Sequence, residues 1–371
     1  MVEIFNCGDI VNTNSENTSL VSNELKEIIS KADFAICNFE APICDDGFGI
    51  AKCGPVLRQS SNLVTKLKAI GFDMFLLANN HIMDYGYDGL ANTISLIEDE
   101  GLYHVGAGSN FNKIYEPRIL EIKGLKIGVI NCCEAQFGVH DFYAKFEDSG
   151  YAWVNHPKID KNIIELKKQC DFIIVYVHAG LENEYVPQIE WRYRYRHLCD
   201  LGADAIIASH PHVPQGYEKY GNSCIFYSLG NFFFDWGSGS KPSFSVVLKL
   251  TKNQPIDFKL VYHKMEKGET VLADEEVVDI DKLNLLIEKD CNDSDYKVAN
   301  KHELRVRKTI INSLSNIPNS NTVIGILKEV VASIIGRRRG INKNIIGLHF
   351  LRNESYHNVI KCSLYEKGIK K

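Results

Sequence analysis

Side chains that can bind metal ions or transfer protons follow nearly every short apolar run in the first two thirds of the sequence. The runs IFNCGD, AICNFE, FLLANNH, IIVYVH and AIIASHPH end in Asp9, Glu40, Asn80, His81, His178, His210 and His212. Carboxylates, imidazoles and an amide oxygen are the mixture that holds two divalent ions about 3.5–4 Å apart, with a carboxylate bridging them. These endings therefore predict a metal site.

Two ions held in this way lower the pKa of a bound water and hold the oxygens of an in-line displacement. Taken singly, each residue has an ordinary alternative. Asp9 could cap a turn after Gly8, and His178 could be a hydrogen-bonded core histidine. His210 and His212 form the strongest pair, because two imidazoles one residue apart can face two ions. The joint placement of all these residues at run ends favours the metal site.

The elements that must position these residues alternate between short β-rich runs and helical patterns, which is typical of an α/β domain. Expected strands cover residues 2–7, 34–38, 73–78, 126–131, 171–177, 205–208 and 224–229. Expected helices cover residues 62–69, 88–100, 159–168 and 189–201. A hairpin is expected at 119–130, turning at Lys123 and Gly124, with antiparallel strands at 243–250 and 257–263. Because strand C-terminal ends line the ligand crevice of open α/β sheets, the candidate residues can converge.

The pattern changes after residue 280, and we divide the chain into a domain at 1–280 and a helical extension at 281–371. Expected helices cover 281–289, 301–315 and 323–335, with a loop at 316–321 and a basic tail that begins at 337–339. Helix 323–335 has one apolar face. Such a face usually packs on a core, and we expect packing here. The alternative is contact with an anionic membrane through this helix and the arginines.

The composition is that of an ordinary globular protein, with 371 residues, 45% of them hydrophobic and 24% charged. The net charge of -5 argues against a nucleic-acid partner. No basic and apolar leader opens the sequence, so we expect no signal peptide. The eleven cysteines are odd in number and contain no CxxC pair, which indicates reduced thiols and predicts a cytoplasmic location.

Several longer motifs contain the candidate residues in a fixed order. They are NFEAPI at 38–43, LANNHIMDYGYDGL at 77–90, GAG at 106–108, HAGLE at 178–182, GADAIIASHPHVPQGYE at 202–218 and IFYSLGNFFFD at 225–235. In order and spacing, this region resembles the CapA family of poly-γ-glutamate capsule-synthesis proteins, which is similar to the calcineurin-like metallophosphoesterases. The resemblance implies a four-layer αββα sandwich of two mixed sheets, here followed by the helical extension.

The resemblance also implies a role for each candidate residue. His81 is expected to protonate a leaving oxygen, and Glu40 to bridge two ions. The metal ligands implied in this way are Asp9, Glu40, Asn80, His178, His210 and His212. The sequence departs from the phosphoesterase pattern at Val11, where a histidine ligand is expected, so one ion site lacks a ligand. Ser209 also replaces a histidine that many relatives have.

Five further residues lie in or near these motifs with less specific roles. Lys52 and Arg58 could hold an anionic substrate, or belong to an exposed basic loop. Asp84 could fix the loop that carries His81, or cap the following helix. Glu182 could orient a histidine ligand, or be a surface acid. Asn231 could support the metal site, or shape a turn.

The resemblance implies a protein of capsule or exopolysaccharide biosynthesis that is a metal-dependent hydrolase with phosphoesterase-type chemistry. Its cofactors would be one or two divalent ions: Mn, Fe, Zn or Mg. Its partners would be an anionic polymer or phosphorylated substrate, and polymer-synthesis proteins. Two alternatives stay open: a non-catalytic assembly factor, favoured by Val11 and the added helices, and a phosphatase acting on small phosphorylated metabolites.

Overall fold

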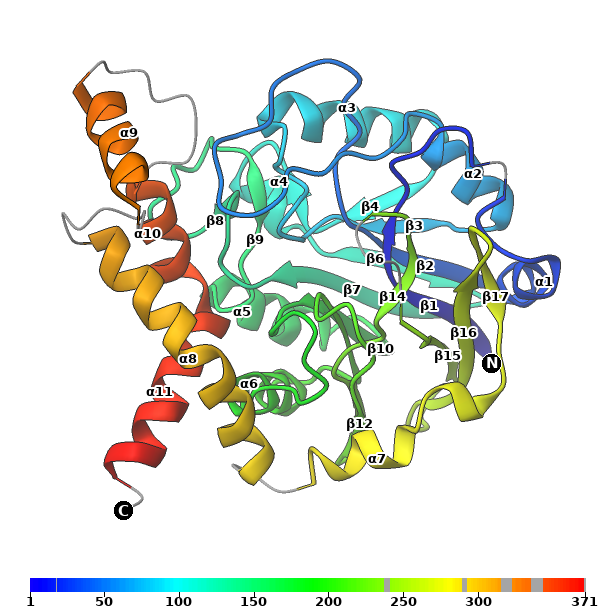
Figure 1. Ribbon diagram of the computed structural model, residues 1–371. Coiled ribbons are helices and arrows are strands. Elements are labelled where there is room, and N and C mark those ends of the chain that lie inside the picture. The colour runs from blue at the N-terminus through cyan, green and yellow to red at the C-terminus, as the bar shows by residue number, and fades with distance from the viewer. Residues whose placement is uncertain (18, 237–240, 289–291, 315–321, 335–342, 370–371) are drawn as a thin grey trace.

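Two β-sheets pack face to face in the computed structural model of the chain, and helices cover them on the outside (Figure 1). The structure describes residues 1–371 except 18, 237–240, 289–291, 315–321, 335–342 and 370–371. The predicted loop at 316–321 and the arginines at 337–339 lie outside the described residues. Within the described part of the chain, no helix is both long and apolar enough to cross a bilayer.

The first sheet has eight strands, with the N-terminal strand β1 at its centre. Its order is β17-β16-β15-β1-β2-β3-β4, and β14 also pairs with β1. Strands β1 to β4 run parallel, whereas β15, β16 and β17 are antiparallel. The bounds are β1 Val2–Val11, β2 Phe34–Phe39, β3 Met74–Leu76, β4 Tyr103–Val105, β14 Asn231–Phe234, β15 Ser243–Leu250, β16 Asp257–Glu266 and β17 Glu269–Leu272. All of β2 is buried, as its sequence, apolar except for Asn38, predicts.

The second sheet has six strands in the order β12-β13-β11-β10-β7-β6. Strands β7, β10, β11 and β13 are parallel, and β6 and β12 close the edges in antiparallel pairing. The bounds are β6 Arg118–Ile122, β7 Leu125–Cys133, β10 Phe172–His178, β11 Ala205–Ser209, β12 Tyr217–Tyr220 and β13 Ser223–Phe226. Lys123 and Gly124, both with positive φ, form the predicted two-residue hairpin turn between β6 and β7.

Three hydrophobic layers hold the sheets and helices together. Ile4 and Ile36 of the first sheet meet Val129 and Ile174 of the second in the core between the sheets. A second layer joins the first sheet to its outer helices, and a third joins the second sheet to its own. Those outer helices are α1 Asn23–Lys31, α2 Leu63–Ile70 and α3 Gly86–Asp99 on the first sheet, and α5 Pro157–Leu166 and α6 Ile189–Asp200 on the second. The four-layer αββα sandwich is therefore confirmed.

Short elements connect the layers. Strands β5, β9 and β8 form a separate three-stranded sheet beside helix α4. The bounds are β5 Ala107–Gly108, α4 Phe111–Tyr115, β8 Val139–His140, β9 Gly150–Ala152, the 3-10 turn η1 Glu275–Val277 and α7 Ile280–Leu285. The helix predicted at 281–289 is thus confined to α7 within the described residues.

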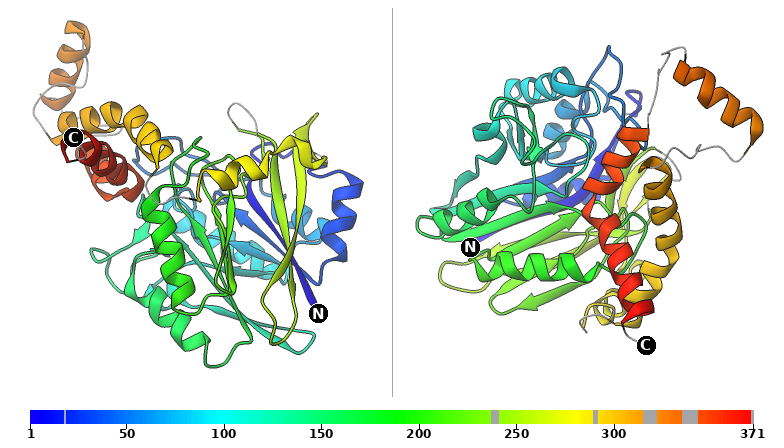
Figure 2. Two further views of the ribbon diagram at one scale, coloured as in Figure 1. Left: turned by 90° about the horizontal axis from the view of Figure 1, so that it is seen from below. Right: turned by 90° about the vertical axis from the view of Figure 1, so that its left-hand side faces the viewer.

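The C-terminal extension forms a helical layer along one side of the sandwich (Figures 1 and 2). It consists of α8 Asp293–Leu314, α10 Lys343–Arg352 and α11 Glu354–Gly368, with α9 Val323–Ile334 between α8 and α10. The sequence predicted no helix in the basic tail, whereas α10 and α11 occupy residues 343–352 and 354–368 of it. Because α11 buries Ser355, Asn358 and Ser363 beside a single apolar residue, Val359, it lacks the apolar periodicity that reveals a helix.

Helix α9 does not pack as the sequence predicted. Val323, Ile324, Leu327 and Val331 are 74%, 68%, 57% and 50% exposed. Figure 2 shows α9 extending away from the sandwich and from the other C-terminal helices. The expectation of core packing is therefore wrong for these four side chains, and this apolar helix face has no cover within the described chain.

Candidate metal centre

The predicted ligands lie at the C-terminal ends of parallel strands from both sheets. Asp9 is near the end of β1, Glu40 follows β2, and Asn80 follows β3. His178 is the last residue of β10, and His210 and His212 follow β11. Because both sheets end at the same edge of the sandwich, all six predicted ligands meet there, as the contacts below show.

A local irregularity in β1 sets the position of Asp9. The pairing register of β1 with β2 shifts between Cys7 and Asp9, which places Gly8 in a bulge. A Cβ atom at Gly8 would lie 1.8 Å from the carbonyl oxygen of Gly230, so only glycine allows this close approach. The Asp9 amide then donates to that same carbonyl oxygen at 3.3 Å. Bulges commonly redirect a side chain beside an active site, and here the redirected side chain is Asp9.

The turn after β11 holds two histidines in an unusual backbone conformation. His210 and His212 have φ angles of 101° and 58°. Backbone strain of this kind in non-glycine residues clusters at functional sites, because the surrounding structure must hold it. Two hydrogen bonds from the neighbouring segment fix the turn: the amides of Ala179 and Asn183 donate to the carbonyls of Ser209 and Pro211.

The donor atoms form two groups that share one carboxylate. In the first group, ligand atoms of Glu40, His178 and His210 lie within 4.8 Å of one another. In the second, ligand atoms of Asp9, Glu40 and His212 do so. Glu40 is therefore the carboxylate common to both groups. Two adjacent groups with a common carboxylate suit a pair of divalent ions.

Glu40 is also the residue whose environment most requires a cation. Its side chain is fully buried, and neither carboxylate oxygen has a hydrogen-bond partner among the described residues. Burying a carboxylate without hydrogen bonds or a counter-charge is strongly unfavourable. His178 Nε2 and His212 Nε2 lie 3.4 and 3.9 Å from Glu40 Oε1. The donor set thus fits one or two divalent ions coordinated by Glu40.

His178 lies at the centre of the first group. Its Nε2 atom is 3.0 Å from Asn80 Oδ1 and 3.0 Å from His210 Nδ1. The amide oxygen of Asn80 therefore lies beside the first group. The opposite ring nitrogen of His178 lies 3.2 Å from Asn38 Nδ2, which also donates to Asp9 Oδ1 at 2.7 Å.

The two histidines of the β11 turn differ in charge. Burial lowers the pKa of His210 well below its usual value, and nearby His178 adds to the shift, so the His210 imidazole is neutral. Burial would also lower the pKa of His212, but the carboxylates of Glu40 and Asp9 more than offset this and raise it to about 10. Without a metal ion, protonated His212 is therefore the positive charge between two acids.

His81 is held by an acid–base chain beside the metal-binding groups. Its Nδ1 atom lies 2.7 Å from Asp84 Oδ2, while Lys52 Nζ contacts Asp84 Oδ1 at 2.5 Å. The amide of Leu57 donates to Asp84 Oδ2 at 2.7 Å. Asp84 therefore positions His81, which agrees with the first of the two roles that the sequence allowed for Asp84, fixing the loop that carries His81. Lys52 is buried and also donates to the Asn80 carbonyl, so its ammonium group holds the loop that carries Asn80 and His81.

The remaining predicted residues divide into one that contacts a ligand and two at the surface. Asn231 Oδ1 lies 2.9 Å from His212 Nδ1, so Asn231 orients that imidazole. Glu182 is exposed, and its charge adds to the effects of Glu40 and Asp9 on the pKa of His212. Arg58 is exposed and donates to the carbonyls of Cys44 and Asp45.

Two buried polar residues of the site were missed from the sequence. Asn38 lies two residues before Glu40 in an extended strand, so the alternation of side chains predicts that the two share a face. Glu134 directly follows β7, and Glu134 Oε1 lies 3.5 Å from His210 Nε2. The strand-end rule that found the other ligands would also have found Glu134. Burial raises the pKa of Glu134 to about 8, and nearby Glu354 adds to the shift.

Positions 11 and 209, where the sequence lacks an expected histidine, differ in what the structure places there. Val11 belongs to a buried apolar cluster with Ala41, Leu57 and Phe234 and provides no donor atom. Among the described residues, the second group therefore consists of Asp9, Glu40 and His212. Ser209 ends β11, and its carbonyl fixes the β11 turn as described above.

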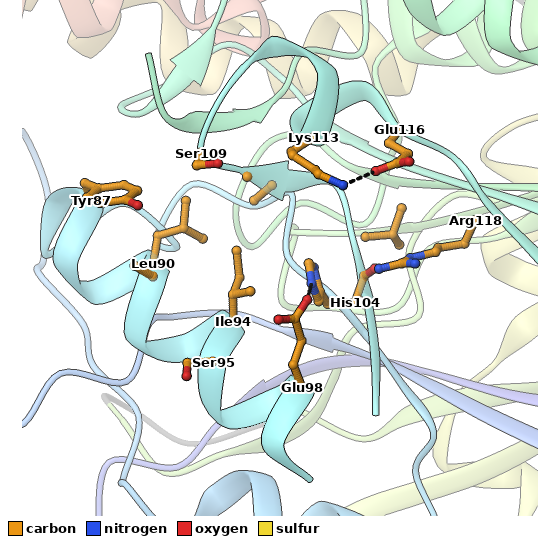
Figure 3. Close-up of a pocket in the computed structure, with 14 residues that line it drawn as sticks. Tyr87, Leu90, Ile94, Ser95, Glu98, His104, Ser109, Lys113, Glu116 and Arg118 are labelled. Carbon is orange, nitrogen blue, oxygen red and sulfur yellow. Dashed lines mark hydrogen bonds and ion pairs between the residues drawn. The ribbon is translucent and has the colours of Figure 1, made fainter. Parts of the chain in front are cut away.

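A separate hollow of about 340 Å³ lies between α3, β4 and α4 (Figure 3). Leu90 and Ile94 are among its apolar lining residues, and none of the predicted ligands lines it. Its charged groups contact one another: Lys113 pairs with Glu116 at 3.1 Å, and His104 with Glu98 at 3.2 Å. The chemistry predicted from the sequence therefore belongs to the metal centre, away from this hollow.

Comparison with known proteins agrees with the motifs. The family described as bacterial capsule synthesis protein PGA_cap matches residues 4–236. The capsule biosynthesis protein CapA of Bacillus anthracis is 30% identical over 263 residues, which are 69% of this chain and 64% of that protein. The PGA biosynthesis protein CapA of Bacillus subtilis is 30% identical over 244 residues, which are 65% and 64%. The alignments thus span just under two thirds of each relative.

Among solved structures, the chain is similar to the calcineurin-like phosphoesterase YfkN from Bacillus subtilis. The identity is 14% and the TM-score is 0.39, with 80% of this chain and 98% of that chain covered. The layers and strand order described above define the fold of this chain independently of that similarity.

Proposed function

This chain belongs to the PGA_cap family of bacterial capsule synthesis proteins, and from that premise we propose that it is a metal-dependent hydrolase in the synthesis of a poly-γ-glutamate-type capsule or exopolymer. The observation that carries the enzymatic part is Glu40, a buried carboxylate without hydrogen bonds that is shared by two groups of metal donors. Two divalent metal ions held in this way catalyse hydrolytic displacement at phosphate esters. The substrate class we propose is an anionic polymer or a phosphorylated intermediate.

In this mechanism the chain's own residues hold the ions and move protons. Asp9, Glu40, Asn80, His178, His210 and His212 would hold one or two divalent ions, of Mn, Fe, Zn or Mg. When bound, such ions supply an activated water and stabilise the charge of the departing oxygen. Asp84 lies 2.7 Å from His81 Nδ1, which leaves Nε2 of the same ring to deliver a proton to the leaving oxygen.

The proposal is tested by comparing metal content and turnover in purified variants. Glu40→Gln should lose the divalent ions, because it removes the carboxylate common to both groups. His81→Ala should keep the ions but lose turnover on a panel of phosphate esters by about 10²–10⁴-fold, the usual contribution of a general acid. The control is His104→Ala, in the separate hollow. A wild-type chain that retains no divalent ion would refute the hydrolase proposal.

A second candidate function is a non-catalytic assembly factor of a polymer-synthesis complex. Two observations favour it: Val11 gives the second group no fourth ligand, and the helical extension adds a surface beyond the family match. It predicts that the ions bind, that His81→Ala does not reduce polymer production, and that a synthesis protein co-purifies through residues 281–371. Turnover of small soluble phosphates alone would instead support a metabolite phosphatase.

We further propose that the polymer is made at an anionic membrane surface and that α9 contacts it. The exposed side chains Val323, Ile324, Leu327 and Val331 present an apolar helix face. The sequence places three arginines, at 337–339, shortly after this helix. An apolar face next to cationic residues suits the interface of a bilayer that contains anionic lipids. The reduced-cysteine pattern of the sequence supports the cytoplasmic face of that membrane as the location.

A further inference from the structure

The C-terminal extension reaches the metal centre through one buried acid, Glu134. This residue is fully buried at the end of β7. On one side, Glu134 Oε1 lies 3.5 Å from His210 Nε2. On its other side, Glu134 contacts the junction between α10 and α11, more than a hundred residues beyond the end of the family match at residue 236.

Three side chains hold the carboxylate of Glu134 in place. The Ser355 hydroxyl donates to Oε2 at 2.5 Å, and the Asn353 amide donates to Oε1 at 3.2 Å. The Gln136 amide donates to Oε1 at 2.7 Å. Ser355 and Asn353 are 1% and 3% exposed, so water does not compete for these bonds. The carboxylate therefore has a fixed direction, which is toward His210.

The two ring nitrogens of His210 face different groups. Its Nδ1 atom faces the metal donors, 3.0 Å from His178 Nε2. Its Nε2 atom faces Glu134 and lies 3.3 Å from Gln136 Nε2. A metal-binding histidine commonly donates its other N–H to a carboxylate, which fixes the tautomer and the ring orientation and makes the ligand more basic. Glu134 Oε1, 3.5 Å away, is the carboxylate oxygen that would accept that N–H when an ion is held at Nδ1.

We propose that Glu134 is a positioning residue for the metal ligand His210, and that Asn353 and Ser355 complete this support from the C-terminal extension. The extension is then part of the metal centre, and removing its contacts weakens ion binding from a distance. This inference rests on the proposed function only in requiring that the centre binds divalent ions. It does not depend on which bond is hydrolysed.

The competing explanation is that Glu134 only anchors the extension. That explanation has support nearby, because Glu354 already joins the extension to the sandwich: it accepts from Ala135 N at 2.8 Å and from Trp153 Nε1 at 2.8 Å. The two explanations differ in what a variant changes. An anchor alters stability without altering the ion site, whereas a positioning residue alters the affinity and ligand field of the ion.

The experiment measures Mn²⁺ affinity by titration calorimetry and the visible spectrum after Co²⁺ loading, on the full chain. Glu134→Gln should weaken Mn²⁺ binding by about 10- to 100-fold, the usual effect of losing such a partner, and shift the Co²⁺ bands. Ser355→Ala, which leaves every ligand in place, should weaken binding by about fivefold, the effect of one lost hydrogen bond. Melting temperatures of the metal-free proteins report stability separately.

The matched control is Ser363→Ala. Ser363 is a buried serine of the same helix, α11, and its hydroxyl donates to Asn300 Oδ1 at 2.7 Å, within the extension. It should lower the melting temperature somewhat less than Ser355→Ala, because the Ser355 hydroxyl also accepts from Trp191 Nε1 at 2.9 Å, and it should leave Mn²⁺ affinity and the Co²⁺ spectrum unchanged.

The possible results separate a failure of this inference from a failure of the proposed function. Wild-type affinity and spectrum in both Glu134→Gln and Ser355→Ala, whatever their melting temperatures, would overturn this inference and leave the proposed hydrolase intact. If Glu134→Gln does not fold, Ser355→Ala against Ser363→Ala decides. A wild-type chain that binds neither Mn²⁺ nor Co²⁺ would overturn the inference together with the proposed function.

Discussion

Individual side chains of the metal centre balance charge in a way that depends on whether an ion is present. Asp9 and Glu40 are both fully buried. Burial would raise the pKa of Asp9, but the hydrogen bond from His212 and the nearby His178 hold it below the usual value. His212, with its pKa raised to about 10, supplies the compensating charge. A divalent ion would take over that role, and the proton on His212 would have to leave.

The first prediction is therefore that ion binding releases a proton from His212. At about pH 8 this imidazole is charged in the metal-free protein, whereas a ligand imidazole is neutral, so about one proton should be released per chain. Affinity should rise with pH up to about 10, since fewer protons then compete. Titration calorimetry in two buffers of different ionisation enthalpy measures the release. A His212→Asn variant is the control, and an equal release from it would contradict this origin.

A second prediction concerns Asp84, which is a partner of both Lys52 and His81. Asp84→Ala leaves the Lys52 ammonium buried without its carboxylate, so the free energy of unfolding should fall by about 3–5 kcal/mol. Urea denaturation monitors the change. The control is Asp88→Ala, an exposed acid in the first turn of α3, which should lower stability by less than about 1 kcal/mol. An equal loss of unfolding free energy in the two variants would show that the buried Lys52–Asp84 pair stabilises the fold no more than an exposed acid does.

At the scale of elements, strand ends and turns determine which side chains reach the centre. The bulge at Gly8 directs Asp9, and the strained turn after β11 directs His210 and His212. Helix α9 differs from every element of the sandwich, because its apolar face lies outside the cores that hold the other helices. We therefore expect α9 to act by binding a surface outside the described chain.

The third prediction is that α9 binds the full chain to vesicles that contain anionic phospholipid. Leu327→Glu places a charge on the apolar face and should reduce vesicle binding by about tenfold or more, and added salt should weaken binding by the wild-type chain. Co-sedimentation with vesicles measures both effects. Leu285→Glu is the matched control, because Leu285 is a 62% exposed leucine on α7. Equal binding by both variants, or a concentration-dependent dimer without vesicle binding, would contradict the membrane contact.

At the scale of the whole molecule, the extension is joined to the sandwich by buried polar contacts as well as apolar ones. Leu181 packs with Val306, Phe350 and Val359 of the extension. Arg192 of α6 is fully buried and donates to both carboxylate oxygens of Asp295 at 2.7 Å. The extension therefore behaves as part of the folded body, apart from α9.

The fourth prediction tests this attachment. Asp295→Ala removes the carboxylate from the buried Arg192 and should lower the free energy of unfolding by about 3–5 kcal/mol. Protease cleavage within α8 should also accelerate, because the helix loses its main charged contact with α6. Chemical denaturation and timed proteolysis measure the two effects. Asp293→Ala removes an exposed acid two residues away and should change stability by less than about 1 kcal/mol; a similar loss from it would contradict the argument.

The sequence by itself determined the fold class of the sandwich and which side chains are candidate metal donors. Buried parallel strands are continuous apolar runs, and their ends are marked by polar residues, so both signals are local. Asp9, Glu40, Asn80, His178, His210 and His212 were found in this way, and the structure brings all six together. Asp84 was named with the right partner, because it lies in the same motif as His81, whereas the contact of Asn231 with His212 joins two motifs and came from the structure.

Only the tertiary structure decided which distant segments support those donors. Nothing local in the sequence connects Ser355 with Glu134, or Asp295 with Arg192, because such pairs form when separate helices pack against the sandwich. Helix α11 escaped notice because the residues it buries are polar apart from Val359, and α10 because the few residues it buries form no apolar stripe. Helix α9 shows the opposite error: its apolar periodicity predicted a buried face, but periodicity defines a face without defining what covers it.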